Sequence, residues 1–223
     1  MKKITIAIDG PAASGKSTTA KEAAKILNYI YIDTGAMYRA AALAFMRMKL
    51  DYTENDYRIL MDSISIELKQ SENGQRTFLN GEDVSNLIRT PEVTKMVSPV
   101  SANAIVRERL IAMQRQIGTG GGIIMDGRDI GTVVFPNAEL KVFMVASAES
   151  RAERRTKEML ASGIQANYEE IKNNLIARDK YDTERELSPL KPATDAVVID
   201  TSKLSIKEQT QLVVDLALQL INS

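Results

Sequence analysis

The stretch GPAASGKS, residues 10–17, decides the fold class of this 223-residue chain. It fits the pattern G-x-x-x-x-G-K-[ST] at every fixed position, between an apolar run at 4–8 and a helical pattern at 16–27. In such a stretch the glycines let backbone N–H groups surround phosphate oxygens at the start of a helix. The sequence therefore predicts a phosphate-binding P-loop that joins the first strand of a sheet to its first helix.

The side chains of this loop indicate a triphosphate with a metal ion. Lys16 is expected to reach the β- and γ-phosphates of ATP, and the Ser17 hydroxyl is expected to ligate Mg²⁺. The predicted ATP-binding residues of the loop are Gly10, Pro11, Ala12, Ala13, Ser14, Gly15, Lys16, Ser17 and Thr18. The alternative is a glycine-rich turn with a chance lysine, and the flanking strand and helix argue against it.

Short apolar runs alternate with longer helical patterns along the chain. The candidate strands lie at 4–8, 29–32, 122–125, 140–146 and 196–199. The candidate helices lie at 16–27, 36–48, 102–117, 148–162, 168–180 and 205–220. The strands lack strict alternation, as expected where both faces of a sheet are covered. This order predicts an α/β fold with a parallel sheet and right-handed crossovers.

Two segments interrupt the alternation. Residues 63–84 alternate apolar and polar residues around Asn73-Gly74 and Asn80-Gly81, and Asn-Gly pairs favour tight turns, so we expect a small antiparallel insert. Residues 149–185 are helical and rich in charge, and form either a solvated pair of surface helices or a mobile cationic lid. The basic residues of this segment include Arg151, Arg154, Arg155, Lys157, Arg178, Lys180 and Arg185.

The composition excludes several classes of function. The chain contains neither cysteine nor histidine, which excludes disulfides, thiolate nucleophiles, imidazole bases and the usual zinc and haem sites. The 29 basic and 29 acidic residues cancel, so no global field attracts nucleic acid or an anionic membrane. The first apolar run is too short for a signal sequence, and no stretch approaches the roughly 20 residues of a membrane span. We predict a cytoplasmic protein that binds neither nucleic acid nor membrane.

A P-loop specifies a triphosphate but no reaction. The Asn-Lys-x-Asp sequence that reads guanine in regulatory GTPases is absent, and a large ATPase motor would need a longer chain. A small-molecule kinase is therefore favoured. Its acceptor site is expected where other strands end, because parallel strands present their carboxyl ends at one rim of the sheet.

Polar and charged residues gather after the second predicted strand and in later segments. The stretch DTGAMYR, residues 33–39, supplies Thr34, Tyr38 and Arg39, although an ordinary Thr-Gly helix start would look the same. Further candidates are Ser98, Arg107, Arg128, Asp129, Arg178, Asp182 and Arg185. Singly they have plain alternatives, such as a helix-face charge for Arg107 and a cap for Asp182. Together the arginines would suit the negative charge of two phosphate groups.

The chain offers no evident base that would activate an acceptor hydroxyl. A phosphate monoester loses its second proton near pH ~6, so it is already a nucleophile at neutral pH. A hydroxyl acceptor would more often need a placed carboxylate. We therefore favour an acceptor that carries its own phosphate.

With these motifs the chain resembles the bacterial-type cytidylate kinases, a family of nucleoside monophosphate kinases. The resemblance covers essentially the whole chain and rests on GPAASGKS, DTGAMYR, the 63–84 insert, DGRDIGTVVFP and RDKYDTER. It implies a P-loop kinase core with a five-stranded parallel sheet and helices on both faces, at 1–35, 110–147 and 190–223. A monophosphate-binding insert containing a small antiparallel sheet would occupy 36–109, and a helical lid would occupy 148–189.

The resemblance also implies roles for single residues of the acceptor site. Ser98, Arg107 and Asp129 would face the cytosine, and Arg39, Arg128 and Arg185 would hold the acceptor phosphate. Arg178 and Asp182 would lie near the ribose hydroxyls. Thr34 and Tyr38 would line the same pocket; Thr34 stands where similar sequences often have serine, and it keeps the hydroxyl.

Further roles concern ATP and its metal ion. The lid residues Arg151, Arg154 and Arg155 would approach the ATP phosphates. Asp126 ends an apolar strand and borders the substrate site, which suits an outer-shell role toward Mg²⁺ and equally suits a strand-end cap. The residues expected to act in catalysis are Lys16, Arg128, Arg155 and Arg185.

The resulting hypothesis is a monomeric enzyme of pyrimidine nucleotide metabolism. It would transfer the γ-phosphoryl group of Mg-ATP directly and reversibly to CMP and dCMP. The enzymatic alternative is a kinase for another monophosphate such as UMP. The alternative from another class is a non-catalytic ATP-binding sensor.

Overall fold

The computed structural model describes residues 2–71, 74–161 and 163–222 of the chain. The chain divides into two compact units, Met1–Tyr31 with Gly120–Ser223, and Ile32–Thr119. We call the first the core unit and the second the inserted unit. Each unit has packed elements of its own.

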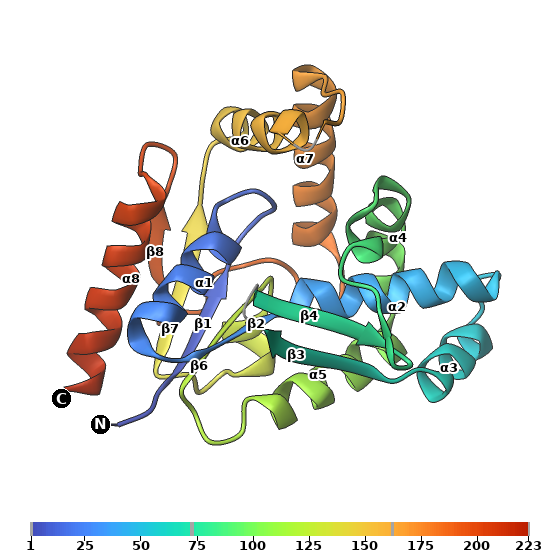
Figure 1. Ribbon diagram of the computed structural model, residues 1–223, viewed down its shortest axis with the longest axis horizontal. Coiled ribbons are helices and arrows are strands. Elements are labelled where there is room, and N and C mark those ends of the chain that lie inside the picture. Colours follow the sequence, from blue (N-terminus) through green and yellow to red (C-terminus); the bar gives the residue numbers. More distant parts are fainter. Residues whose placement is uncertain (1, 72–73, 162, 223) are drawn as a thin grey trace. The chain divides into compact units, whose positions relative to one another are not determined.

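The core unit is built on a five-stranded sheet with the strand order β2-β6-β1-β7-β8 (Figure 1). The strands are β1 (Thr5–Asp9), β2 (Ile30–Asp33), β6 (Ile123–Gly127), β7 (Leu140–Val145) and β8 (Val197–Asp200). Strand β1 pairs in parallel with β6 and β7, and β7 pairs in parallel with β8. The predicted five-stranded parallel sheet is therefore confirmed.

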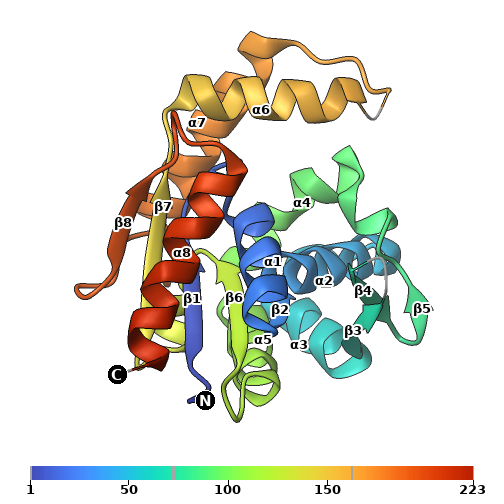
Figure 2. The same ribbon diagram turned by 60° about the vertical axis from the view of Figure 1, so that its left-hand side comes forward.

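Helices α1 (Lys16–Leu27) and α8 (Ile206–Ile221) pack side by side against this sheet (Figure 2). Their small apolar residues, among them Ala20, Ala23 and Val213, are buried against Ile6 and Ile8 of β1. Strand β6 is buried at all five positions, which explains the apolar run Ile123–Met125 with which it begins. This packing fixes the end of β1, where the P-loop begins.

Three further helical elements follow the strands of the core unit. A short π-helical turn, η2 (Ile130–Val134), follows β6. Helices α6 (Ala148–Ala161) and α7 (Tyr168–Glu184) form the charged pair that the sequence predicts between β7 and β8. Helix α7 continues four residues beyond the predicted end at 180. None of the helices among the described residues combines the length and the hydropathy needed to cross a membrane.

The inserted unit combines helices with a small sheet. Its helical elements are α2 (Thr34–Met48), α3 (Glu54–Ser63), η1 (Leu87–Arg89), α4 (Pro91–Ala102) and α5 (Ala104–Ile117). The antiparallel sheet has the order β3-β4-β5, with β3 (Ile66–Ser71), β4 (Gly74–Leu79) and β5 (Glu82–Asp83). These elements enclose a separate hydrophobic core, in which Phe45 lies 5.2 Å from Tyr57 between ring centroids.

One of the two predicted Asn-Gly pairs forms a turn of the small sheet. Asn80 and Gly81 both have positive φ angles, 50° and 82°, as a tight hairpin turn requires. Asn73 of the other pair lies outside the described residues, and Gly74 begins β4. Helices α3 and α4 were not predicted, and the helix predicted at 102–117 begins instead at Ala104, because Asn103 caps it through the N–H groups of Ile105 and Val106.

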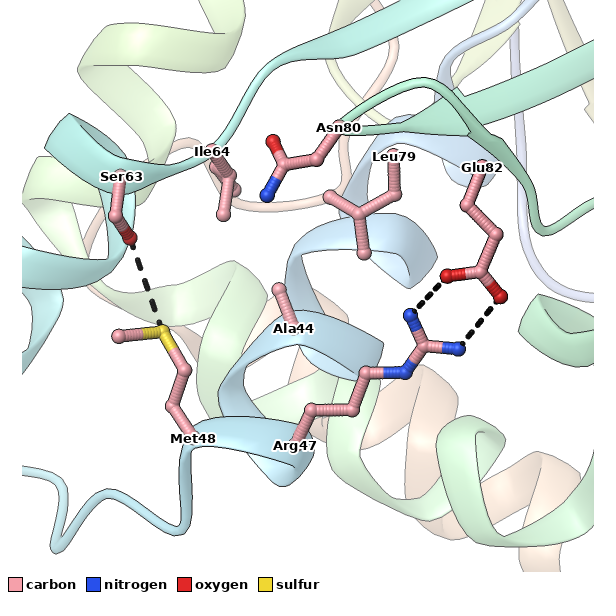
Figure 3. A pocket seen from close by; sticks show the side chains of 8 residues that line it. All are labelled: Ala44, Arg47, Met48, Ser63, Ile64, Leu79, Asn80 and Glu82. Carbon is pink, nitrogen blue, oxygen red and sulfur yellow. Dashed lines mark hydrogen bonds and ion pairs between the residues drawn. The ribbon is translucent and has the colours of Figure 1, made fainter.

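The inserted unit also contains an open pocket of about 320 Å³ beside α2 and β4. Arg47 and Glu82 form a bidentate ion pair on its wall, at 2.6 and 2.9 Å (Figure 3). Ala44, Ile64 and Leu79 supply apolar side chains to the same pocket (Figure 3). No predicted site residue lines it, so the candidate active site lies elsewhere.

Candidate active site

The P-loop adopts a conformation that only glycine fits at two positions. Gly10 has a φ of 154°, and a Cβ atom there would lie 2.2 Å from the carbonyl oxygen of Met144. Gly15 has a φ of 91°, and a Cβ atom there would lie 2.6 Å from Oε1 of Gln209. At Gly10 both the backbone angle and the Met144 backbone demand a residue without a side chain, and at Gly15 the backbone angle does.

Lys16 opens α1 and is almost fully buried, with 7% of its surface exposed. Its Nζ atom donates a hydrogen bond to the carbonyl oxygen of Pro11 at 3.0 Å, so the side chain folds back over the loop. The hydroxyl of Thr19 donates to Gln209 of α8 at 3.0 Å. This bond links the first turn of α1 to the helix that packs beside it. This arrangement keeps one cation beside the loop backbone at which the sequence predicts phosphate binding.

Ser17 and Asp126 bring two oxygen ligands together at the rim of the sheet. The Ser17 hydroxyl donates to Oδ2 of Asp126 at 2.6 Å, and the Tyr31 hydroxyl donates to Oδ1 at 2.9 Å. Asp126 is buried at the end of β6, next to the strand that leads into the P-loop. The carboxylate is thus oriented by two hydroxyls.

These donors fit Mg²⁺. A hydroxyl and a carboxylate are hard oxygen ligands, and Mg²⁺ in nucleotide sites is bound by one or two such groups together with phosphates and water. Among residues 2–71, 74–161 and 163–222 no group of three or more acidic residues could hold a metal by itself. Ser17, with Asp126 behind it, is therefore the place where a nucleotide-bound Mg²⁺ would be held.

We expect Asp126→Asn to raise the Mg²⁺ concentration for half-maximal activity by roughly tenfold, because an amide orients the metal's ligands less well than a carboxylate. Tyr31→Phe is the matched control, since it removes a hydrogen bond to the same carboxylate but keeps its charge. The measurement is the initial rate against free Mg²⁺ at fixed ATP. An unchanged Mg²⁺ requirement in Asp126→Asn would leave Asp126 as a strand-end cap.

A second group of charges lies on the loop after β6 and on α7. Nε of Arg128 donates to Oδ2 of Asp182 at 2.8 Å, and both side chains are largely buried. Arg185 lies 3.9 Å from a carboxylate oxygen of Asp129 and 4.0 Å from one of Asp182. Two arginines and two aspartates thus form one compact network within the core unit.

The charge of Asp182 is maintained by its neighbours. Burial by itself would raise the pKa of this carboxyl, but Arg128, Arg178 and Arg185 outweigh it and lower the pKa below the ordinary value. Arg178 precedes Asp182 by one turn of α7. Because the carboxylate stays ionised, it can hold the arginines in fixed orientations.

The lid arginines have different partners. Arg151 is buried, donates to the carbonyl oxygens of Ala146 and Ala12 at 3.0 and 3.3 Å, and pairs with Asp179. Arg154 donates to the hydroxyl and carbonyl oxygens of Thr201, which follows β8. Arg155 pairs with Glu158 on the surface. Arg151 therefore connects α6, α7 and the P-loop, and it holds these three elements in position.

The inserted unit holds the remaining predicted residues. Thr34 and Tyr38 are buried in the first turns of α2, and Ser98 is half-buried on α4. Arg39 donates to the Thr94 hydroxyl at 2.8 Å and to the Ile88 carbonyl oxygen at 3.4 Å. Thr94 thus orients Arg39, which is predicted to bind the acceptor phosphate.

Arg107 lies in the interior of the inserted unit, with only 4% of its surface exposed. Its guanidinium group donates to the Ser101 carbonyl oxygen at 3.2 Å and lies 5.6 Å from the centre of the Tyr38 ring. An exposed helix-face charge is therefore not what the structure places here. This buried guanidinium group lies over an aromatic ring and is held by a hydrogen bond. Such an arginine is suited to recognising a flat polar ligand.

The structure brings the predicted residues together in two sets. Within the core unit Lys16, Ser17 and Asp126 lie at the P-loop, and Arg128, Asp129, Asp182 and Arg185 form the charged network. Within the inserted unit Tyr38 lies beside Arg107. Sequence reasoning missed Asp9, Tyr31, Thr94 and Gln209, which contact, in this order, the loop after β6, Asp126, Arg39 and the first turn of α1. Of these four residues, only Asp9 could have been suspected from the sequence, because it ends the strand directly before the P-loop.

Fold and site together define a P-loop kinase, since a parallel sheet carries the lysine and serine of the loop beside an aspartate that ends the neighbouring strand. The chain also matches the model of the Cytidylate kinase family over residues 6–223. It belongs to the cytidylate kinase family.

Relatives support this membership over the full length. A protein named Cytidylate kinase from Bacillus anthracis is 52% identical over 219 residues, which cover 97% of either chain. Proteins with the same name from Bacillus cereus and Bacillus thuringiensis are 52% and 53% identical, over 96% and 94% of either chain.

Solved structures support the fold alone. An uncharacterized protein from Eubacterium ventriosum has a TM-score of 0.55 at 13% identity, and the alignment covers 98% of this chain and 99% of that chain. Shikimate kinase from Bacteroides thetaiotaomicron has a TM-score of 0.50 at 12% identity, over 97% of this chain and 99% of that chain.

Proposed function

We propose that this protein transfers the γ-phosphoryl group of ATP to CMP and forms CDP and ADP. One observation carries the proposal: a P-loop with a buried lysine lies in a chain that matches the cytidylate kinase family from residue 6 to residue 223. The arginine–aspartate network beside it supports an acceptor that brings its own phosphate. We extend the proposal to dCMP as acceptor and to a monomer as the working state.

The reaction needs no enzyme nucleophile. An oxygen of the CMP phosphate forms the new bond to the γ-phosphorus while the bond from that phosphorus to the bridging oxygen of ADP breaks, and ADP leaves with the electron pair. Lys16 and the arginines Arg128 and Arg185 compensate the charge that spreads over the transferred group. Mg²⁺, held at Ser17, would add further positive charge when it is bound with ATP.

The remaining residue roles follow the resemblance. Arg39 would assist with the acceptor phosphate, and Ser98, Arg107 and Asp129 would recognise the cytosine edge. Arg178 and Asp182 would serve the ribose. The division into a core at 1–35, 110–147 and 190–223, an acceptor insert at 36–109 and a lid at 148–189 likewise stays a proposal. In this proposal closure of the lid excludes water and so prevents hydrolysis of ATP.

A panel of acceptors tests the proposed function. ADP release is measured with Mg-ATP and each of CMP, dCMP, UMP, AMP and GMP. We expect CMP to give the highest kcat/KM, with dCMP next. A preference for UMP would make the protein a kinase for that monophosphate, and tight ATP binding without stimulation by any monophosphate would indicate a sensor.

We expect Arg107→Ala to lower kcat/KM for CMP by a factor of order 10², because a charge-assisted hydrogen bond in a buried site would be lost. Discrimination between CMP and other monophosphates should fall with it. Arg109→Ala is the control: this arginine lies two residues later on α5, but it pairs with Asp62 on the surface. An equal loss of activity with every acceptor would reassign Arg107 to a structural or phosphate-binding role.

A further inference from the structure

Asp9 is a buried carboxylate that was not among the predicted site residues. It is the last residue of β1, directly before the P-loop, and only 5% of its surface is exposed. Its two oxygens accept hydrogen bonds from the backbone N–H groups of Ile130 and Gly131, both at 2.8 Å. Burial of a carboxylate is costly unless such bonds compensate it. The two N–H groups therefore account for its position.

These two N–H groups belong to the first turn of η2, where backbone donors lack partners within the helical turn. The residue at the cap position is Asp129, and aspartate is among the best capping residues. Nevertheless, the Asp129 side chain makes no capping hydrogen bond. A residue 121 positions earlier in the sequence caps the turn instead. The Asp129 carboxylate is thereby directed toward other partners, and Arg185 lies 3.9 Å from it.

The surroundings of Asp9 are crowded and charged. Gly131 lacks a side chain at this contact, and a Cβ atom there would lie 3.3 Å from the Lys141 side chain and 3.5 Å from Asp9. Burial raises the pKa of Asp9 to about 7; the two N–H groups and Lys16 act against this rise, and Asp129 adds to it. The charged groups that act on Asp9 are thus Lys16, at the start of the P-loop helix, and Asp129, on the loop after β6.

We propose that Asp9 is a positioning residue that caps η2 from the end of β1. In this way it fixes Arg128 and Asp129 relative to the P-loop and keeps the Asp129 carboxylate available for the acceptor nucleotide. The part that concerns the acceptor rests on the function proposed above. The part that concerns the cap rests on the two hydrogen bonds alone.

Asp9→Asn tests the proposal with almost no change in shape. An amide offers one acceptor oxygen, so its NH₂ group would face the second backbone N–H and one bond would be lost. We expect kcat/KM for CMP to fall at least about tenfold, with the KM for ATP changed less than about threefold. Hydrogen exchange at the amides of Ile130 and Gly131 should become faster.

Glu139→Gln is the matched control. The Glu139 carboxylate accepts a hydrogen bond from the Thr5 N–H at 2.8 Å, at the opposite end of the same strand β1. This change removes the same kind of charge beside the same strand, but away from the P-loop. We expect its kinetics with CMP and ATP to equal those of the unchanged protein.

Two results would overturn the proposal. The first is an Asp9→Asn protein whose kcat falls in proportion to its folded fraction while both KM values stay the same, since that describes a structural residue only. The second is unchanged amide exchange at Ile130 and Gly131. If the unchanged protein does not phosphorylate CMP, the proposed function fails, and amide exchange in Asp9→Asn still decides the cap.

If Asp9→Asn does not fold, the unchanged protein supplies the test. The amide NMR signals of Ile130 and Gly131 should shift with a midpoint near pH 7, because their common acceptor titrates there. The Thr5 amide, bonded to Glu139, should not follow that midpoint. Amides of Ile130 and Gly131 that exchange in the unchanged protein as fast as amides without a hydrogen bond would overturn the cap.

Discussion

Replacement of Lys16 by methionine is expected to lower kcat for CMP phosphorylation by roughly 10³, with the fold retained. The Nζ atom is held at the P-loop by the Pro11 carbonyl oxygen, so it is placed before substrates bind. Methionine fills a similar volume but removes the charge that compensates the transferred phosphoryl group. The rate is measured as ADP release at saturating CMP and ATP, and the fold is checked by thermal unfolding.

Lys25→Met is the control for this change. Lys25 lies near the end of the same helix and pairs with Glu22 on the surface at 2.7 Å. Exposed pairs of this kind contribute about 1 kcal/mol or less, so neither activity nor stability should change measurably. Retention of more than about a tenth of kcat in Lys16→Met would contradict a role of Lys16 in the transfer.

Arg128→Ala is expected to lower kcat by roughly 10²–10³, since a guanidinium group would be missing where charge develops during transfer. The change also removes the bond to Asp182, whose carboxylate is buried. Arg128→Lys separates these effects, because lysine keeps the charge but loses the planar fork. We expect it to recover part of the stability and little of the rate. Rates are measured as before, and stability by denaturant unfolding.

Arg47→Ala is the control for the arginine series. This arginine also makes a bidentate pair with a carboxylate, that of Glu82, but it lies beside the surface pocket of the inserted unit. Its removal should leave kcat and both KM values unchanged. If Arg128→Ala behaved in the same way, the network of Arg128, Asp129, Asp182 and Arg185 would be structural and the acceptor phosphate would bind elsewhere.

The parts of the fold that local sequence specifies were predictable. The P-loop motif of residues 10–17 is local in sequence, and the apolar runs of β1 and β6 follow from burial on both sides. Helix α4 was missed because Pro99 argues against a helix, yet this proline lies near the end of α4, only three residues before the helix ends at Ala102. Thr90 and Pro91, a cap followed by proline at the first position, were the available signal.

The positioning contacts were not predictable from one sequence. Asp9 reaches amides 121 residues away, and Thr94 orients Arg39 from a helix 55 residues away. Such pairs depend on the tertiary arrangement and leave no spacing pattern. The lid arginines illustrate the same limit: Arg151, Arg154 and Arg155 look alike in sequence, but only the fold shows that Arg151 is buried against Asp179.

The separate hydrophobic core of the inserted unit bears on how specificity can evolve. Its apolar residues pack among themselves, with Tyr57, Leu60 and Val97 in one cluster. Substitutions that share no partners usually change stability additively, so changes within this unit can accumulate without disturbing the P-loop strand. Under the proposed function, a lineage could therefore change the residues of this unit that face the base, Ser98 and Arg107, while Lys16 and Ser17 of the P-loop stay under unchanged selection.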